Sequence, residues 1–208
     1  MITNKLSISG WVMKTRVITA WFIHTKARLS LLLRSSLILS SLLLLASCSS
    51  ASIEDYADTN PKLDLASFFD GELYAAGVVE DFSGKVVRKF TVKMQASWQE
   101  NEGKLEEWFV YDDGEKQTRI WYITDLGDGQ YKGKAGDIIG EATGVAKGSA
   151  LRWRYDMLLT VDDSDYQVHF DDWMYLVDEN TIINKSDIIK FGLTVAKVTL
   201  VISKIPKA

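Results

Sequence analysis

The sequence predicts an all-β protein that folds as a single antiparallel up-and-down barrel after an N-terminal signal peptide. Three observations support this fold class. Apolar and polar residues alternate along many segments, glycine- and aspartate-rich turns separate these segments, and no proline occurs between Pro61 and Pro206. Period-two alternation is typical of half-buried antiparallel strands. Consecutive long hairpins favour closure into a barrel, which leaves no exposed sheet edge. A two-sheet sandwich is the alternative.

Residues 1–47 have the composition of a secretory signal peptide. Six lysine and arginine residues and no acidic residue occur here, and the uncharged stretch 35–47 ends the segment. The apolar centre, residues 37–46, is too short to cross a bilayer as a helix, which needs about 20 apolar residues. A basic leader followed by a short apolar core indicates export. The start codon is either Met1 or Met13.

The apolar core ends at Leu45-Ala46-Ser47-Cys48, which contains the only cysteine of the chain. These four residues resemble the lipobox of bacterial lipoproteins. The resemblance implies that the sulfur of Cys48 receives a diacylglycerol, that the peptide is cut before it, and that fatty acids such as palmitate are attached. Two or more acyl chains anchor a protein stably to a membrane. Because Ser49 follows, the sorting rule of Gram-negative lipoproteins implies the periplasmic face of the outer membrane.

The chain that remains after residue 47 is expected to be one acidic domain. It has 161 residues, of which 18 are basic and 28 acidic, so its formal net charge is −10. This charge argues against nucleic-acid binding, because the chain would repel phosphate. Residues 48–62 comprise Cys48, whose lipidation the lipobox resemblance implies, and a small, polar stretch that predicts a flexible tether. Residues 63–205 are predicted to form the barrel.

The alternation is clearest in two segments. In 89–98 the apolar residues take the even positions, and in 150–161 they take the odd positions, while arginine and aspartate fill the even ones early in that segment. Turn sequences such as Asp112-Asp113-Gly114 separate the strands. The predicted strands are 72–82, 86–98, 104–112, 116–125, 130–135, 138–147, 150–161, 166–177 and 193–203.

One short helix is expected before the last strand, at residues 187–191. Ser186 suits its N-cap, Asp187 suits the positive end of its dipole, and Gly192 suits its C-terminal end. Glycines also crowd the region of the sixth strand, which indicates bulges, a bend where a barrel closes, or a loop. These glycines are Gly133, Gly136, Gly140, Gly144 and Gly148.

Four stretches of the chain resemble the DUF3833 family of small proteobacterial lipoproteins. They are FFDGELYAAGVVEDFSGKVVRKFTVKMQASW, YDDGEKQTRIWYI, YKGKAGDIIGEATGVAKGSALRWRYDMLLTV and HFDDWMYLVDENTIINKSDIIKFG. The similarity covers about residues 63 to 203, and DDWMYL is its most specific part. It implies a lipobox and a lipocalin-like β-barrel, and it implies no established activity.

Motifs for catalysis and cofactor binding are not found. His169 is the only histidine after the leader, and Cys48 is expected to be acylated, so no His/Cys zinc site is expected. Nothing like Gly-x-Ser-x-Gly occurs to seat a nucleophile, and the glycine-rich segment 135–148 lacks the Gly-Lys-Ser/Thr ending of a phosphate loop. We therefore expect no enzyme activity, no cofactor and no metal. His169 is expected to be a partly exposed structural residue.

The candidate ligand-binding residues are Arg88, Arg119, Asp172 and Trp173. Asp172 shares strand parity with apolar neighbours such as Phe170, so it becomes a buried carboxylate if that face is interior, and it then needs a partner. Arg88 and Arg119 are the candidate partners. Such a charged patch would orient the head group of a ligand inside an apolar cavity. The alternative is a structural ion pair that fixes strand register.

These observations predict an envelope lipoprotein that binds a lipid or another apolar small molecule in its barrel. The alternative is a non-enzymatic scaffold or assembly lipoprotein that binds a protein partner through an exposed apolar face. Both hypotheses follow from strands that are apolar on both faces. Trp121 and Tyr122, for example, are neighbours and therefore face opposite sides of their strand. Two-sided apolarity indicates a lined cavity on one face and, on the other, either a contact surface or packing under the tether.

Overall fold

The computed structural model describes residues 50–161 and 164–205. The predicted signal peptide and the predicted lipidation of Cys48 lie outside the described residues. Among the helices in the described ranges, none combines the length and the apolar character needed to cross a bilayer.

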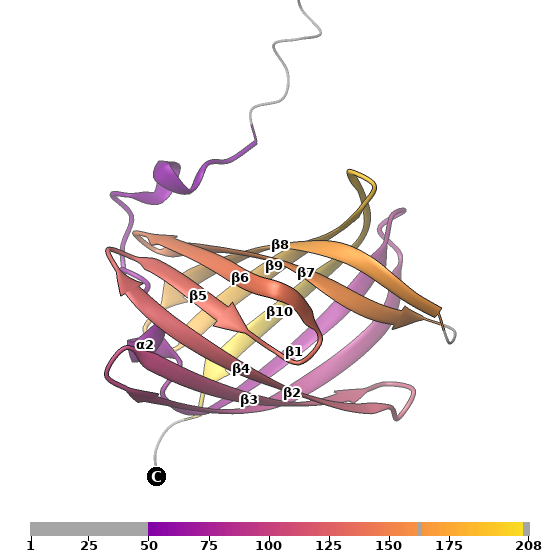
Figure 1. Ribbon diagram of the computed structural model, residues 1–208, viewed down its shortest axis with the longest axis horizontal. Helices are drawn as coiled ribbons and strands as arrows, with labels where there is room; N and C mark the ends of the chain where they lie inside the picture. The colour runs from indigo at the N-terminus through magenta and orange to yellow at the C-terminus, as the bar shows by residue number, and fades with distance from the viewer. Residues whose placement is uncertain (1–49, 162–163, 206–208) are drawn as a thin grey trace, which may run out of the picture. The chain divides into compact units, whose positions relative to one another are not determined.

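Ten antiparallel strands close into one barrel (Figure 1). Each strand pairs with the one before it in the chain, and the last pairs with the first, so that Ala76 lies opposite Val201. The strands are β1 Gly71–Asp81, β2 Val86–Gln99, β3 Glu102–Tyr111, β4 Lys116–Gly127, β5 Gln130–Lys134, β6 Ile138–Lys147, β7 Ala150–Val161, β8 Ser164–Asp178, β9 Thr181–Lys190 and β10 Leu193–Lys204. The closed antiparallel barrel is therefore confirmed, and the sandwich is excluded.

The barrel core follows the predicted alternation of side chains. In β2, Phe90, Val92 and Met94 are buried, whereas the lysines beside them are exposed. In β7, Leu151 and Trp153 are buried on the same inner face. Successive residues of a strand point to opposite sides, so each strand presents one apolar row to the interior and one mainly polar row to the outside.

The helix predicted at residues 187–191 is wrong, because these residues mostly belong to β9. Four alternate residues of β9 point inward and are buried: Ile182, Asn184, Ser186 and Ile188. Two of them are polar, which hid the period-two pattern in the sequence. Phe191 and Gly192 have φ values of 52° and 78° and form the tight turn to β10, so Gly192 serves a hairpin turn.

A short helix, α2 (Leu65–Phe68), covers one end of the barrel. Asp64 caps it by accepting a hydrogen bond from the backbone N–H of Ser67 over 2.8 Å. Leu65 and Phe68 are buried in the core. The indole N–H of Trp98 donates to the carbonyl of Phe69 over 2.9 Å, which fixes the exit of the helix to β2.

Part of the predicted tether lies against the outside of the barrel. Residues Ile53–Tyr56 form a 3-10 helix, η2. The ring centroid of Tyr56 lies 5.8 Å from that of Trp173 and 5.6 Å from that of Tyr175 on β8. Thr59 shares a hydrogen bond with the hydroxyl of Ser149 over 2.9 Å. From η2 onward, the chain is thus held by contacts with the strands.

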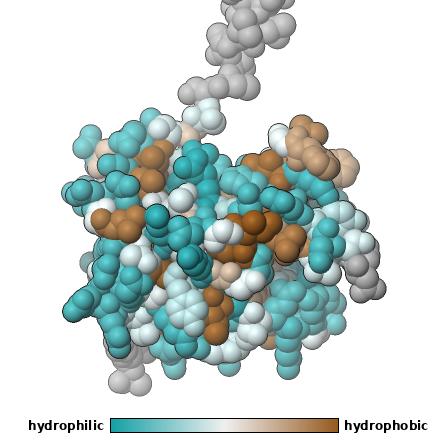
Figure 2. Space-filling view, viewed as in Figure 1, coloured by the Kyte–Doolittle hydropathy of each residue, from teal (hydrophilic) through white to brown (hydrophobic). Residues whose placement is uncertain are grey.

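The end of the barrel opposite α2 is formed by hairpin tips. The antiparallel register places the β1–β2, β3–β4, β5–β6, β7–β8 and β9–β10 connections at this end. Two tips carry highly exposed aromatic residues, Phe82 (86 % exposed) and Phe191 (93 % exposed). Brown hydrophobic side chains gather over the β9–β10 tip at the upper right of Figure 2. We call this end the mouth.

The glycine-rich region forms strands with an irregular register. The pairing of β6 with β7 shifts between Ile139 and Thr143, and Gly140 there has a φ of 76°. The glycine-rich residues 138–147 thus form a strand whose register with β7 is irregular, and they are not a loop. Farther along the sheet, the indole of Trp153 packs directly on Gly133 and Gly144, where a Cβ atom would collide with it.

Candidate functional site

The barrel encloses a cavity of about 890 Å³. This volume lies in the range of small-molecule sites. Most of the lining side chains are apolar or aromatic and come from strands all around the barrel. Leu65 and Phe69 form its floor beside α2, and Arg88, Asp113 and Glu115 line it at the mouth.

Aromatic rings form one wall of the cavity. The centroid of Trp121 lies 5.7 Å from that of Trp153 and 5.3 Å from that of Tyr155, with the ring planes nearly perpendicular. Tyr155 stacks on Phe170 with centroids 5.0 Å apart. Edge-to-face and stacked pairs are the favoured arrangements of aromatic rings, so these rings form a continuous apolar wall.

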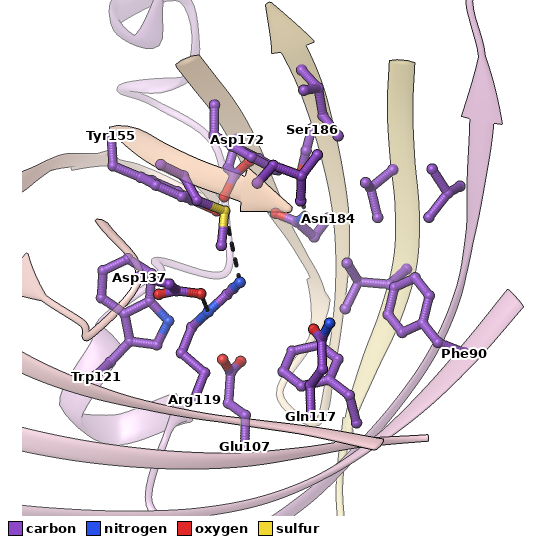
Figure 3. A pocket seen from close by; sticks show the side chains of 18 of the residues that line it. Phe90, Glu107, Gln117, Arg119, Trp121, Asp137, Tyr155, Asp172, Asn184 and Ser186 are labelled. Atoms are coloured by element: carbon purple, nitrogen blue, oxygen red, sulfur yellow. Dashed lines mark hydrogen bonds and ion pairs between the residues drawn. The ribbon is translucent and has the colours of Figure 1, made fainter. Parts of the chain in front are cut away.

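A cluster of polar side chains interrupts the apolar lining about halfway along the strands (Figure 3). Glu107 comes from β3, Arg119 from β4, Asp137 from the β5–β6 connection, Tyr155 from β7, Asp172 from β8, and Asn184 and Ser186 from β9. We call these seven residues the polar cluster. Nε of Arg119 donates to Oδ2 of Asp137 over 2.8 Å, and Nδ2 of Asn184 donates to the hydroxyl of Ser186 over 2.9 Å.

Several polar atoms of the cluster have no partner. Oε2 of Glu107, Oδ1 of Asp172 and Oδ1 of Asn184 are buried without a hydrogen bond. The three residues are 9 %, 6 % and 4 % exposed. Buried polar atoms in proteins are nearly always hydrogen-bonded. These unpaired acceptors are therefore free to accept hydrogen bonds from a molecule that enters the cavity.

Burial changes the protonation of the two carboxyls. It raises the pKa of Glu107 from 4.5 to about 7, against the lowering effect of the nearby Arg119 charge. It also raises the pKa of Asp172 from 3.8 to about 6, although Ser186 and Tyr155 beside it favour the charged form. The pKa of Arg119 is lowered by burial but raised, on balance, by Tyr155, Glu107 and Asp137. Arg119 therefore stays positive while the carboxyls titrate near neutral pH.

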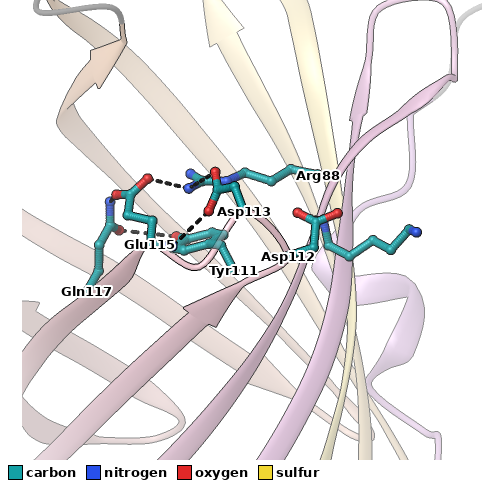
Figure 4. A network of polar contacts seen from close by, with 7 residues as sticks. Arg88, Tyr111, Asp112, Asp113, Glu115 and Gln117 are labelled. Carbon is teal, nitrogen blue, oxygen red and sulfur yellow. Dashed lines mark hydrogen bonds and ion pairs between the residues drawn. The ribbon is translucent and has the colours of Figure 1, made fainter.

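A second polar group lies at the mouth (Figure 4). The guanidinium of Arg88 pairs with Asp113 over 2.9 Å and also with Glu115. It lies 3.5 Å from the ring centroid of Tyr111, whose hydroxyl is hydrogen-bonded to Gln117 over 3.1 Å. The guanidinium of Arg88 is thus already in contact with two carboxylates and one aromatic ring at the mouth.

Three of the four predicted ligand-binding residues line the cavity: Arg88, Arg119 and Asp172. Of the two arginines considered as partners of Asp172, Arg119 shares the polar cluster with it, and Arg88 lies at the mouth. Trp173 does not line the cavity, because it follows Asp172 on β8 and neighbouring residues face opposite sides. It lies outside, where it stacks on Tyr175 with centroids 6.1 Å apart.

His169 lies on the outer face of β8. Its Nδ1 atom is 2.9 Å from Oδ1 of Asp156 on β7. Its side chain is 42 % exposed, so its placement agrees with the predicted partly exposed residue. Within residues 50–161 and 164–205, no group of three or more histidine, cysteine, aspartate or glutamate side chains is arranged to hold a metal ion.

Five residues of the polar cluster are not among the ligand-binding residues predicted from the sequence: Glu107, Asp137, Tyr155, Asn184 and Ser186. The signal for Glu107 was its parity with Leu105 and Phe109, but the adjacent Glu106 made the segment resemble an exposed, charged stretch. Asn184 was missed because β9 was not predicted as a strand.

The chain belongs to the DUF3833 family, whose model, described as a protein of unknown function, matches residues 42–204. A search of curated proteins finds no match. Among solved structures, the S-type phycobiliprotein lyase from Guillardia theta is similar in fold, with a TM-score of 0.50 and 7 % identity; the match covers 76 % of this chain and all of that one. A Nostoc punctiforme protein of the DUF3598 family, also of unknown function, has a TM-score of 0.45 and 10 % identity, with coverages of 71 % and 51 %.

Proposed function

We propose that this member of the DUF3833 family binds an apolar or amphipathic small molecule inside its barrel. The observation that carries the proposal is the cavity of about 890 Å³, with its aromatic wall and its buried cluster of unsatisfied polar atoms. An apolar ligand would gain roughly 25 cal/mol for each Å² removed from water, and the polar cluster would fix its orientation. The fold similarity to a phycobiliprotein lyase is compatible with small-molecule binding.

The protein would carry out this binding as a lipoprotein of the cell envelope. The lipobox-like sequence that ends at Cys48 and the basic leader support this part of the proposal. Acyl chains on Cys48 would hold the barrel at the periplasmic face of the outer membrane, where lipids and other apolar molecules are concentrated. Metabolic labelling with radioactive palmitate tests the anchor. Label on the wild type but not on Cys48→Ser is expected, and an unlabelled wild type would contradict the anchor alone.

The proposed role is binding without turnover. His169, the histidine of the mature chain, lies on the outer face with Asp156 and cannot act on a molecule in the cavity. The polar cluster is made of carboxyls, a guanidinium, a phenol, an amide and one serine hydroxyl. These groups suit the recognition of a polar head.

The direct test is to purify the Cys48→Ser protein and examine what it carries. Native mass spectrometry and analysis of the organic extract are expected to show a small apolar molecule in stoichiometric amount. An empty protein that also fails to take up an apolar fluorescent dye would contradict the proposal. A matched variant, Trp121→Ala, removes part of the cavity wall and is expected to weaken dye binding, whereas Trp108→Ala on the outside is not.

A second candidate function is supported by the exposed aromatic tips at the mouth. Phe82 and Phe191 are almost fully exposed, and exposed apolar groups of this kind mark contact sites. A scaffold lipoprotein would use them to hold a protein partner. The double variant Phe82→Ser/Phe191→Ser separates the two functions, because it would abolish a partner contact and leave dye binding in the cavity intact.

A further inference from the structure

The unpaired atoms of the polar cluster are mainly hydrogen-bond acceptors. Five buried side-chain atoms in the described part of the chain have no partner, and four of them are oxygens: those of Glu107, Asp172 and Asn184 named above and Oδ1 of Asp137. The fifth, Nε of Arg88, belongs to the mouth. An unpaired buried acceptor is unfavourable, so the cluster favours a molecule that brings donors.

Asn184 gives the clearest indication of what is missing. Its Nδ2 atom already donates to Ser186 over 2.9 Å, which leaves Oδ1 as the free atom. A carboxyl can accept or donate depending on its protonation, but an amide oxygen only accepts. The ligand group that reaches Asn184 must therefore carry an N–H or O–H bond.

The charges of the cluster indicate which kind of donor. Glu107, Asp137 and Asp172 are three carboxyls, and Arg119 is the cation among them, already paired with Asp137. When Glu107 and Asp172 are ionised, they are buried negative charges in excess, and buried charges are costly unless paired. A fatty-acid carboxylate would add another negative charge. A protonated nitrogen would neutralise one charge and donate hydrogen bonds at the same point.

We propose, building on the ligand-binding function above, that the cavity takes an amphipathic amine. Its apolar body lies against the wall formed by Trp121 and Trp153, and its protonated N–H group donates to the free oxygens of Glu107, Asp172 and Asn184. The donor is a nitrogen cation, because such a group offsets the charge of the buried carboxylates and donates hydrogen bonds at the same point. Carboxylate-headed amphiphiles of the same length bind more weakly.

The test compares head groups at constant chain length. The neutral apolar dye N-phenyl-1-naphthylamine is bound in the purified barrel and displaced by decylamine, decan-1-ol or decanoate. Decylamine is expected to bind about tenfold or more tighter than decanoate, as expected for one charge-assisted hydrogen bond. A lysophospholipid with an ethanolamine head presents the same amine behind a phosphate. If it matches decylamine, the amine comes from a membrane lipid, and if it binds less well, the amine comes from a free molecule.

Glu107→Gln should remove most of the preference for decylamine over decanoate, because it removes a charge and keeps the shape of the side chain. Glu106→Gln is the matched control. Glu106 is the neighbouring residue on β3, faces outward and pairs with Lys104 over 2.9 Å, so the preference should survive there. If Glu107→Gln does not fold, as judged by circular dichroism, Asp172→Asn makes the same comparison.

The outcomes distinguish this inference from the function on which it rests. If the dye and decan-1-ol bind but decanoate binds as tightly as decylamine or tighter, the barrel is a binder and the amine inference is wrong. The inference is also wrong if Glu107→Gln and Asp172→Asn, both folded, retain the full preference. If neither the dye nor any decyl compound binds, the proposed function itself fails.

Discussion

Nε of Arg119 and Oδ2 of Asp137 are joined by a 2.8 Å hydrogen bond between β4 and the β5–β6 connection. This ion pair ties the connection at the mouth to the interior of the barrel. Nη2 of the same guanidinium donates to the sulfur of Met157 over 3.8 Å. Arg119 therefore supports both the position of Asp137 and the charge balance of the cavity.

Replacing Arg119 with methionine is expected to destabilise the protein by about 3 kcal/mol, because it leaves carboxyls in a buried site without their cation. The loss should be smaller in a Glu107→Gln background, where one carboxyl is already neutral. Urea unfolding of the wild type, the two single variants and the double variant measures the coupling between Arg119 and Glu107. Arg154→Met, an exposed arginine on β7, is the control and should change stability by less than about 0.5 kcal/mol. Additive losses from Arg119→Met and Glu107→Gln would show that the two charges do not interact.

The buried carboxyls predict an unusual dependence of stability on pH. Because the pKa of Glu107 is raised from 4.5 to about 7 in the folded state, the folded protein holds a proton there that the unfolded chain has lost. Stability should therefore fall as the pH rises from about 4.5 to about 7, by about 3 kcal/mol for Glu107 alone. Asp172, whose pKa rises to about 6, adds a similar loss between about pH 4 and pH 6.

Urea unfolding between about pH 4 and pH 8 measures this slope. Glu107→Gln should reduce it to the part that Asp172 contributes below about pH 6, and Glu106→Gln should leave it unchanged. The surface carboxylates whose pKa values are lowered, such as Asp81, which is hydrogen-bonded by Ser83, lose their contribution only below about pH 4 and do not interfere in this range. An equal slope in wild type and Glu107→Gln would mean that Glu107 is ionised in the folded protein.

The alternation of apolar and polar residues predicted both the barrel and the inward position of Asp172. On β8, Asp172 shares its parity with Phe170 and Leu176, so the apolar neighbours identified the inner face and placed the carboxyl on it. The same parity places Trp173 outside. Trp173 is among the predicted ligand-binding residues, but its position next to Asp172 on the strand decides that its side chain faces outward.

Two errors in the sequence-based predictions, the unpredicted strand β9 and the unpredicted Glu107, occurred at the polar cluster. Alternation identifies a strand only when its inner face is apolar. On β9 the inner face includes Asn184 and Ser186, so the strand was not recognised and a helix was predicted. On β3 the polar inner residue is Glu107. A functional cavity requires polar groups at core positions, and these groups are the ones that break the pattern.

Alanine at Gly133 or Gly144 is expected to destabilise the barrel by about 1–3 kcal/mol, because Trp153 would be displaced. A Cβ atom on Gly133 would lie 2.5 Å from Cζ2 of Trp153. The shift of Trp153 should also change its fluorescence and weaken dye binding. Gly136→Ala is the control, since no atom lies within 4 Å of the added Cβ. Thermal unfolding of the three variants measures the difference, and equal stability of Gly133→Ala and Gly136→Ala would contradict the tight packing on Trp153.

The outer aromatic cluster predicts a separable role for Trp173. Tyr56 of η2 packs on Trp173 and Tyr175, and the guanidinium of Arg152 lies 5.2 Å from the ring centroid of Trp173. Trp173→Ala removes the central ring of this cluster, so residues 53–61 should separate from the barrel more often and be cut faster in limited proteolysis. Dye binding in the cavity should be unchanged, because Trp173 faces outward. Trp108→Ala, on the outer face of β3, should leave cleavage at wild-type rate. Weaker dye binding in Trp173→Ala with unchanged proteolysis would place Trp173 in the ligand site instead.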